Sequence, residues 1–141
     1  MEHTNLEKAK KLLIQTGNTC VLCNDAVVLT DNRRGVRPLL DLLKSNTDVS
    51  GFSVADKVVG KAAAFLYCLL NIRELYTPVI SQPALEVLQN AGISVVYDTL
   101  VSAIQNRTKD GYCPMERAVW DIHDAHAAYS AICDTLKKLT K

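Results

Sequence analysis

The sequence predicts an α/β protein whose mixed sheet is covered by helices on both faces. Two short apolar runs around Asn24-Asp25 indicate a β-hairpin, and the stretch from residue 74 to residue 98 alternates strand, helix and strand. A hairpin supplies antiparallel pairing and a strand–helix–strand unit supplies parallel pairing, so together they predict a mixed sheet. The chain has 141 residues, of which 48% are hydrophobic. We therefore expect one domain, residues 1–141, with its own core.

The first third of the chain predicts a helix followed by the hairpin. Thr4 and Glu7 have the Ser/Thr-x-x-Glu spacing of a capping box. Apolar residues then recur at helical spacing, which predicts a helix from about Asn5 to Gln15 that ends before Gly17. The segment "TCVLCNDAVVLTDN" follows, and it places the tight turn of the hairpin at Asn24-Asp25.

The middle of the chain predicts a turn, a short helix, a loop and a buried helix. "NRRG" is a turn, and the leucine-rich "VRPLLDLLKS" predicts a short helix with Pro38 near its first turn. "NTDVSGFS" is polar and typical of a loop. Within "VADKVVGKAAAFLYCLLNI", alanines and leucines predict a buried helix from about Gly60 to Asn71.

The last third predicts two strands and two helices. "ELYTPVIS" is a strand, and "PALEVLQNAG" is a helix with proline at its start and glycine at its end. The continuous apolar run of "ISVVYD" is typical of a strand covered on both faces. "TLVSAIQNR" fits a helix and a strand equally, and "TKDGYC" is a loop. One amphipathic helix from Pro114 to Lys138 is predicted by the spacing of Ala118, Ile122, Ala125, Tyr129, Ile132 and Leu136.

Composition argues against several classes of partner. The formal net charge is +1, with 16 basic and 15 acidic residues, which argues against nucleic-acid binding and against a polybasic membrane contact. No apolar run approaches the roughly 20 residues that cross a bilayer. The polar N-terminus "MEHTNLEKAKK" has no apolar stretch of a secretory signal, and five cysteines fit reduced thiols. We expect a soluble, cytoplasmic protein.

The order of predicted elements resembles that of the cytidine deaminase-like superfamily, which implies a three-layer α/β/α fold. Active members open one helix with His-x-Glu and the next with Pro-Cys-x-x-Cys, and zinc is held between the two helix starts. The first motif falls on "GKAAAF", where Lys61 takes the ligand position and Ala63 the glutamate position. The second falls on "PALEV", where Pro83 remains and Ala84 and Val87 take the thiolate positions.

The resemblance therefore implies a fold without its zinc chemistry. All three ligands and the proton-carrying glutamate are replaced, and a lysine binds a metal only after a large shift of its pKa. We expect no metal site and no cofactor, and whether any other reaction is catalysed stays open. The motifs "ADKVVGKAAA" and "CPMERAV" resemble a small prokaryotic family of unknown function within this superfamily, over nearly the whole chain.

A polar cluster before the buried helix is the first candidate site. Asp56, Lys57 and Lys61 lie close together, and the free N–H groups of a helix start beside Lys61 favour a phosphate or carboxylate ligand. The predicted ligand-binding residues are Asp56, Lys57, Lys61 and Ser81, which precedes the next helix. The alternative is structural, with Asp56 capping the helix region and pairing with Lys61.

The motif "GYCPMERAVW" is the second candidate site. Cys113 precedes a helix start, where a thiol ionises more readily and becomes nucleophilic, and Glu116 lies in the first turn. In the functional interpretation, Lys61, Cys113 and Glu116 line one cleft as a catalytic set that holds a ligand or forms a covalent adduct. In the alternative, Cys113 is a small packing residue and Glu116 is a helix cap.

Other motifs have simpler structural interpretations. Cys20 and Cys23 have Cys-x-x-Cys spacing, but residues three apart in a strand point to opposite faces, which argues against a metal or redox pair. A metal site needs three or four converging donors, so His123 and His126 are best explained as surface residues. The remaining candidates are Arg33, Arg34 and Arg37 as phosphate ligands or as a solvated turn, and Trp120 and Tyr129 as core or oligomer contacts.

Three functions follow from these patterns. The first is a zinc-free deaminase-fold protein that binds a small anionic metabolite, such as a nucleotide, in the former active-site cleft. The alternative is a non-catalytic interaction or regulatory module with a decayed pocket, for which a homodimer is expected. The third is a thiol redox protein that uses Cys113 or "CVLC". A co-purified ligand, a large apolar interface or a lowered thiol pKa distinguishes the three.

Overall fold

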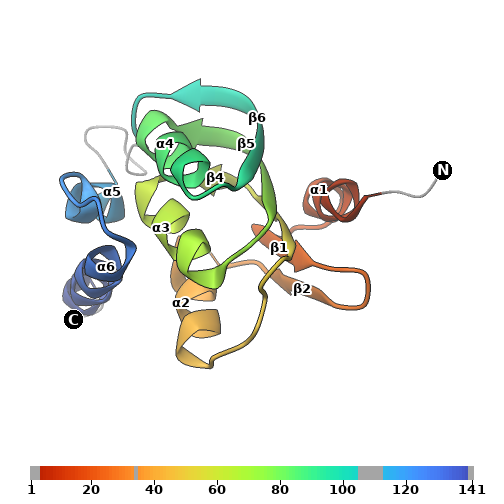
Figure 1. Cartoon of the computed structure of the whole chain (residues 1–141), viewed down its shortest axis with the longest axis horizontal. Helices are drawn as coiled ribbons and strands as arrows, with labels where there is room; N and C mark the ends of the chain where they lie inside the picture. The colour runs from red at the N-terminus through yellow and green to blue at the C-terminus, as the bar shows by residue number, and fades with distance from the viewer. Residues whose placement is uncertain (1–3, 34, 105–112, 140–141) are drawn as a thin grey trace.

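The predicted hairpin and the parallel strands join in one mixed sheet. We describe residues 4–33, 35–104 and 113–139 of the chain from a computed structural model (Figure 1). The described residues form six strands: β1 (Cys20–Cys23), β2 (Val28–Asp31), β3 (Ser53–Asp56), β4 (Val58–Val59), β5 (Glu74–Ser81) and β6 (Ser94–Val101). β1 pairs antiparallel with β2 and β3, whereas β5 pairs parallel with β3, β4 and β6. The order β2-β1-β3-β5-β6 confirms the mixed sheet.

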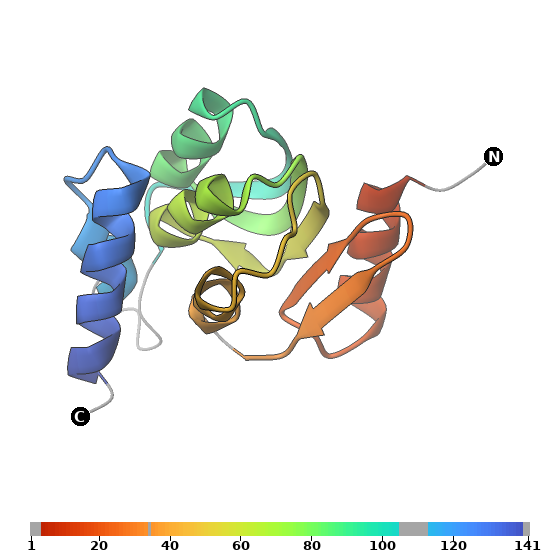
Figure 2. The ribbon, with the colours of Figure 1, turned by 60° about the horizontal axis from the view of Figure 1, so that its bottom comes forward.

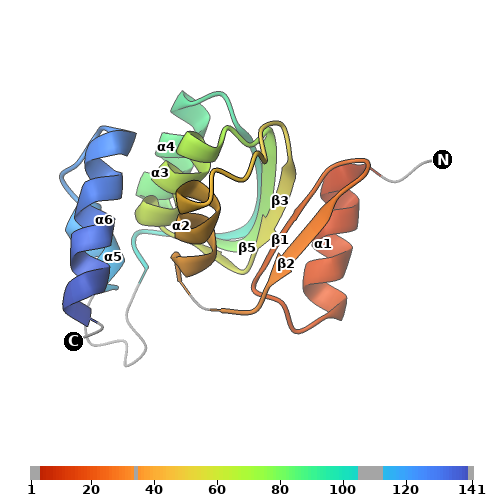
Figure 3. The ribbon, with the colours of Figure 1, turned by 90° about the horizontal axis from the view of Figure 1, so that it is seen from below.

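Helices cover both faces of this sheet. The helices are α1 (Asn5–Gln15), α2 (Arg37–Lys44), α3 (Lys61–Leu70), α4 (Gln82–Asn90), α5 (Pro114–Val119) and α6 (Ala125–Leu139). Helix α1 lies on one face, and α2, α3 and α4 lie on the other (Figure 3). Helices α5 and α6 pack on the outer side of α3 instead of on the sheet (Figure 2). The predicted α/β/α layers are confirmed, with a further helical layer outside them.

Two apolar clusters hold these layers together. The larger lies between the sheet and the α2–α4 layer and includes Val54, Leu66 and Leu75, all fully buried. The smaller lies under α1 and includes Leu13 and Val21. Cys20 belongs to the larger cluster and Cys23 to the smaller, so the two thiols lie on opposite faces of the sheet, as strand alternation predicts.

The structure corrects two predictions about strands. Strands β3 and β4 lie where no strand was predicted: β3 begins at Ser53, the last residue of the predicted loop, and both strands are too short to give a clear pattern. The apolar start of β6 predicts burial on both faces, but Val96, Tyr97 and Leu100 are 48%, 39% and 40% exposed. Among the described residues β6 lies at the edge of the sheet; α4 packs on it, and α1 contacts β1, β3 and β5.

The single predicted C-terminal helix is also wrong, because the chain turns between α5 and α6. The N–H of Ile122 donates to the carbonyl oxygen of Val119 (3.0 Å), which closes a turn. The Asp124 carboxylate then accepts the N–H of Ala127 at 2.8 Å and starts α6 anew. The ambiguous segment, which begins at Thr99, continues β6 as far as Val101, and its last residues, 105–107, lie outside the described chain. No helix within the described ranges is long and apolar enough to span a membrane.

Candidate functional site

The start of α3 is capped by a carboxylate from a distant part of the chain. Gly60 precedes the helix and has no side chain to cap it. The Glu116 carboxylate accepts a hydrogen bond from the N–H of Lys61, and its second oxygen accepts the N–H of Ile104 at 3.2 Å. Glu116 is only 1% exposed. The predicted anion site at this helix start is therefore occupied by the protein's own carboxylate.

Close packing at this contact explains the glycine. A Cβ atom built on Gly60 would lie 2.7 Å from Oε1 of Glu116, closer than real Cβ contacts. The N–H of Cys113 also donates to the carbonyl oxygen of Ile104 at 2.9 Å. Glu116 therefore ties together three segments: the start of α3, the chain after β6 and the start of α5. This geometry matches the structural alternative for Glu116, as a cap, although the helix it caps is α3.

A cavity of about 660 Å³ adjoins this contact. It lies between the start of α3, the bend from β3 to β4, the start of α2, α5 and the end of α6. Cavities that hold small molecules usually have volumes of about 300–1,000 Å³, so this volume is suitable. The wall is mostly apolar, with Cys20, Val36, Leu39, Ala62, Met115 and Leu136 among its residues.

Among the described residues, three cationic side chains border the cavity, and two of them form no ion pair there. The Arg33 guanidinium lies 2.7 Å from the carboxylates of both Asp31 and Asp41. Arg37 and Lys57 are exposed and also line the cavity. Neither of them forms an ion pair with any residue that the structure describes. Arg34, the third arginine of the predicted phosphate cluster, lies outside the described residues.

Asp56 lies in the cavity wall at the end of a buried hydrogen-bonded chain. The hydroxyl of Tyr67 donates to Oδ2 of Asp56 at 2.6 Å, and the Cys20 thiol lies 3.3 Å from the same hydroxyl. Burial raises the pKa of Asp56 from 3.8 to about 7, and the hydrogen bond from Tyr67 limits the rise. Burial, together with the charge of Asp56, also raises the pKa of Cys20. Cys20 and Asp56 are register partners in the neighbouring strands β1 and β3, and this pairing brings both side chains to the Tyr67 hydroxyl.

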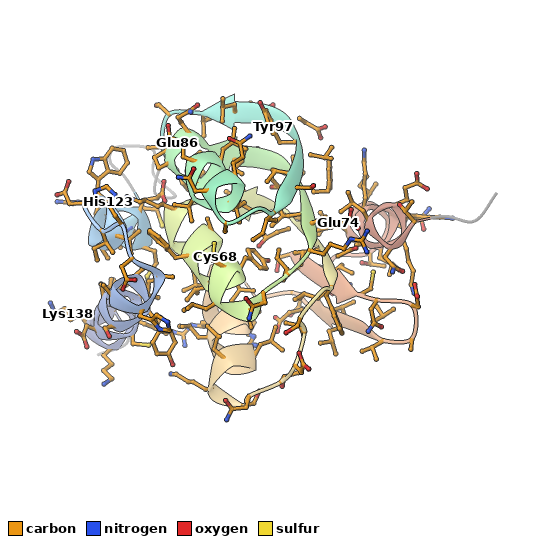
Figure 4. The ribbon with its side chains drawn as sticks, viewed as in Figure 1. Cys68, Glu74, Glu86, Tyr97, His123 and Lys138 are labelled. Carbon is orange, nitrogen blue, oxygen red and sulfur yellow. The ribbon has the colours of Figure 1, made fainter. Side chains whose placement is uncertain are left out.

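The side chain of Lys61 points away from this cavity. Its Nζ donates to the carbonyl oxygen of Trp120 at 2.8 Å, so it does not pair with Asp56. Lys61 lines a smaller cavity of about 380 Å³ between α3, α4 and the α5–α6 connection. Glu86 and His123 line the same cavity and are labelled in Figure 4. Lys61 is the first residue of α3, and its N–H points to Glu116 while its side chain points to Trp120. The spacing of residues in the sequence does not show this difference in direction.

The predicted site residues are therefore distributed over three places. Asp56, Lys57, Cys113 and Glu116 line the larger cavity. Lys61 lines the smaller one, so Lys61, Cys113 and Glu116 do not share a single cleft. The predicted ligand residue Ser81 is buried and caps α4 by accepting the N–H of Ala84 at 3.3 Å, and it lines neither cavity.

The residues that the deaminase resemblance aligns with the zinc motifs are also divided between the two cavities. Lys61, Pro83 and Val87 line the smaller cavity, whereas Ala63 lines the larger one. No three His, Cys, Asp or Glu side chains in the described parts of the chain are grouped so that they could hold a metal ion.

Sequence reasoning missed Tyr67 as a member of the site. Tyr67 lies within a long apolar helical stretch, where an aromatic residue is normally part of the core, and it is fully buried. A signal was available, because a buried tyrosine hydroxyl needs a hydrogen-bond partner and Asp56 is one of few polar residues near the start of that helix. The arginines were considered, but only the structure places Arg37 and Lys57 beside the same cavity.

Comparison with known proteins places the chain in a family. The domain of unknown function DUF1893 (TM1506) matches residues 8–136. The crystal structure of a DUF1893 family protein (TM1506) from Thermotoga maritima is similar, with a TM-score of 0.83 and 26% identity, covering 98% of this chain and 92% of that one. A diaminohydroxyphosphoribosylaminopyrimidine deaminase/5-amino-6-(5-phosphoribosylamino)uracil reductase from Thermotoga maritima has a TM-score of 0.43 and 14% identity, covering 66% of this chain and 34% of that one. No curated protein matches the chain.

The predicted resemblance to a family of unknown function is confirmed by the first of these matches. It extends from the middle of α1 into the last turns of α6, and so includes every residue that borders the larger cavity except Leu139. With a match over most of its length, the chain belongs to the DUF1893 (TM1506) family.

Proposed function

We propose that this protein binds a small anionic metabolite of nucleotide size in the larger cavity, without zinc. The observation that carries the proposal is an apolar cavity of about 660 Å³ bordered by Arg37 and Lys57, which form no ion pair with the described residues. Such cations attract an anionic group, while the apolar wall suits a flat, weakly polar body. A nucleotide combines both properties.

The anionic group of the ligand is expected to bind at the exposed rim of the cavity, beside Arg37 and Lys57, and not at the start of α3. Glu116 already accepts the first N–H of that helix, at Lys61, and its negative charge repels a second anion there. Arg37 and Lys57 are exposed, so a phosphate can reach them without displacing protein atoms. Asp56 is also acidic, but its raised pKa, about 7, leaves it partly protonated at neutral pH and weakens its repulsion of an anion.

The test is binding of nucleoside monophosphates to variants of the rim. We expect calorimetric titration to detect binding that weakens with added salt, and Lys57→Ala and Arg37→Ala each to weaken it about tenfold. Lys44→Ala is the matched control, because Lys44 is an exposed lysine in the last turn of α2 that does not line the cavity. No binding by any nucleotide, or equal loss in the control, would contradict the proposal.

A catalytic role for Cys113 stays a prediction within this proposal. Its thiol lines the cavity, so a bound ligand would meet it there. Lys61 is not assigned a role in this cavity, because its ammonium group is bonded to the carbonyl oxygen of Trp120.

The alternative function, a non-catalytic interaction module, is favoured by β6. Three large apolar side chains, Val96, Tyr97 and Leu100, are exposed on a strand at the edge of the sheet (Figure 4 labels Tyr97). An edge strand of this kind is suited to pairing with a second copy of the chain. Light scattering after gel filtration should then show a dimer that Val96→Lys converts to a monomer, and a wild-type monomer at high concentration would exclude this homodimer.

A further inference from the structure

An acidic residue is unexpected in the wall of a cavity that attracts anions. Asp56 lines the larger cavity directly beside Lys57, at the bend between β3 and β4. A phosphate is attracted to the lysine and repelled by the carboxylate, so Asp56 has no part in holding the anionic end of a ligand. As a wall residue, it is available to the remainder of the ligand instead.

The carboxylate is held in a fixed orientation and has unused acceptor capacity. Oδ2 accepts the hydroxyl of Tyr67 at 2.6 Å, and Oδ1 accepts the N–H of Val58 at 3.4 Å. A carboxylate has about four lone-pair sites, so with respect to the hydrogen bonds of the described residues each oxygen keeps one site for a further donor. Tyr67 is fully buried and its hydroxyl lies 3.3 Å from the Cys20 thiol, so the group that bonds the carboxylate is itself held in place.

We infer that Asp56 recognises the heterocycle of the ligand by accepting hydrogen bonds from two adjacent N–H groups, an edge that guanine presents. The inference rests on the proposed function, since it concerns the other end of the same ligand. The two free acceptor sites lie on the two oxygens of one carboxylate, a geometry that matches two parallel N–H donors. A base with an acceptor at this edge, such as adenine with its N1, would instead face the carboxylate with a lone pair.

This arrangement predicts a measurable order of affinities. A good bidentate pair discriminates against the wrong base by about 10- to 100-fold. Guanosine 5′-monophosphate should therefore bind most tightly, followed by inosine 5′-monophosphate with its one donor, and adenosine 5′-monophosphate should bind weakest. Ribose 5-phosphate, which has the anionic end and no base, reports on Arg37 and Lys57 alone.

The experiment is calorimetric titration of these four compounds at about pH 8, where the Asp56 carboxylate is ionised. The wild-type protein should show the stated order, and Asp56→Asn should bring the affinities for the three nucleotides within a fewfold of one another. Binding of ribose 5-phosphate should not weaken in Asp56→Asn. The asparagine can still accept the Tyr67 hydroxyl, and the melting temperature of the variant checks its fold.

The outcomes separate the two levels of the proposal. If none of the four compounds binds, the proposed function fails and the inference about Asp56 fails with it. If all four compounds bind but the wild-type protein does not prefer the guanine nucleotide, only the inference about Asp56 fails. This outcome is seen with the wild-type protein alone. An Asp56→Asn protein that keeps the full preference for the guanine nucleotide also overturns it.

Discussion

The carboxylate of Glu116 caps the first N–H of α3 at Lys61, although 55 positions separate the two residues. An aligned helix attracts negative charge to its N-terminus, and in this protein α5 supplies that charge from within. The same carboxylate holds Ile104, so one buried side chain joins three segments. The proposed anionic ligand is therefore expected to bind farther out, toward Lys57 and Arg37.

Removing this cap should destabilise the protein. We expect Glu116→Ala to lower the free energy of unfolding by about 3 kcal/mol, because two backbone N–H groups lose a charged acceptor in a buried place. Urea denaturation measures the change. Glu86→Ala is the control, since Glu86 is an exposed glutamate on α4 and should change the free energy by less than about 0.5 kcal/mol. Equal stability of the two variants would show that Glu116 is no structural cap.

Gly60→Ala should also destabilise the fold, by about 1–3 kcal/mol, because the added methyl group overlaps the Glu116 carboxylate. Gly17→Ala is a matched control, since no atom lies within 4 Å of its added Cβ. The effect should be smaller in a Glu116→Ala background, where the overlapping group is absent. Strictly additive effects in this double-mutant cycle would contradict a direct contact between residues 60 and 116.

The stability of the protein should depend on pH through Asp56. Its pKa is raised from 3.8 to about 7 by folding, so the folded state holds a proton that the unfolded state has released. Between about pH 4 and about pH 7, Asp56 therefore lowers the free energy of unfolding as pH rises. Measured by urea denaturation, the free energy of unfolding of the wild type minus that of Asp56→Asn should fall as pH rises across this interval. A difference between the two proteins that grows more favourable to the wild type as pH rises would refute this.

The cysteines should differ in their reactivity toward iodoacetamide. Burial raises the pKa of Cys20 and Cys23, and it raises the pKa of Cys68 to about 11, so these thiols are rarely ionised. Cys113 is partly exposed in the cavity wall and should react faster than Cys20. Peptide mapping by mass spectrometry gives the rate at each position. A ligand in the larger cavity should slow Cys113 selectively, and modification of Cys20 at the same rate as Cys113 would contradict the placement of both thiols.

Much of the architecture could be predicted from local patterns. The capping box at Thr4 and Glu7 gives α1 with the predicted bounds, and the Thr4 hydroxyl does accept the N–H of Glu7 at 3.1 Å. Strand alternation predicts that Cys20 and Cys23 diverge, and they lie on opposite faces. Predictions of this kind succeed because the contacts involved join residues only a few positions apart. The prediction for the last helix failed at Asp124, where a capping side chain outweighs apolar spacing.

The sequence by itself determined α1, the hairpin, the strand–helix–strand unit from β5 to β6 and the mixed sheet, but it did not reveal β3, β4 or the break between α5 and α6. Only the tertiary structure decided where the site residues point. It directs the Lys61 ammonium to Trp120, seats Glu116 at the start of α3 and leaves Lys57 and Asp56 beside the larger cavity. The physical reason is that helix and strand patterns depend on near neighbours, whereas these contacts depend on how α5 and α6 pack on α3.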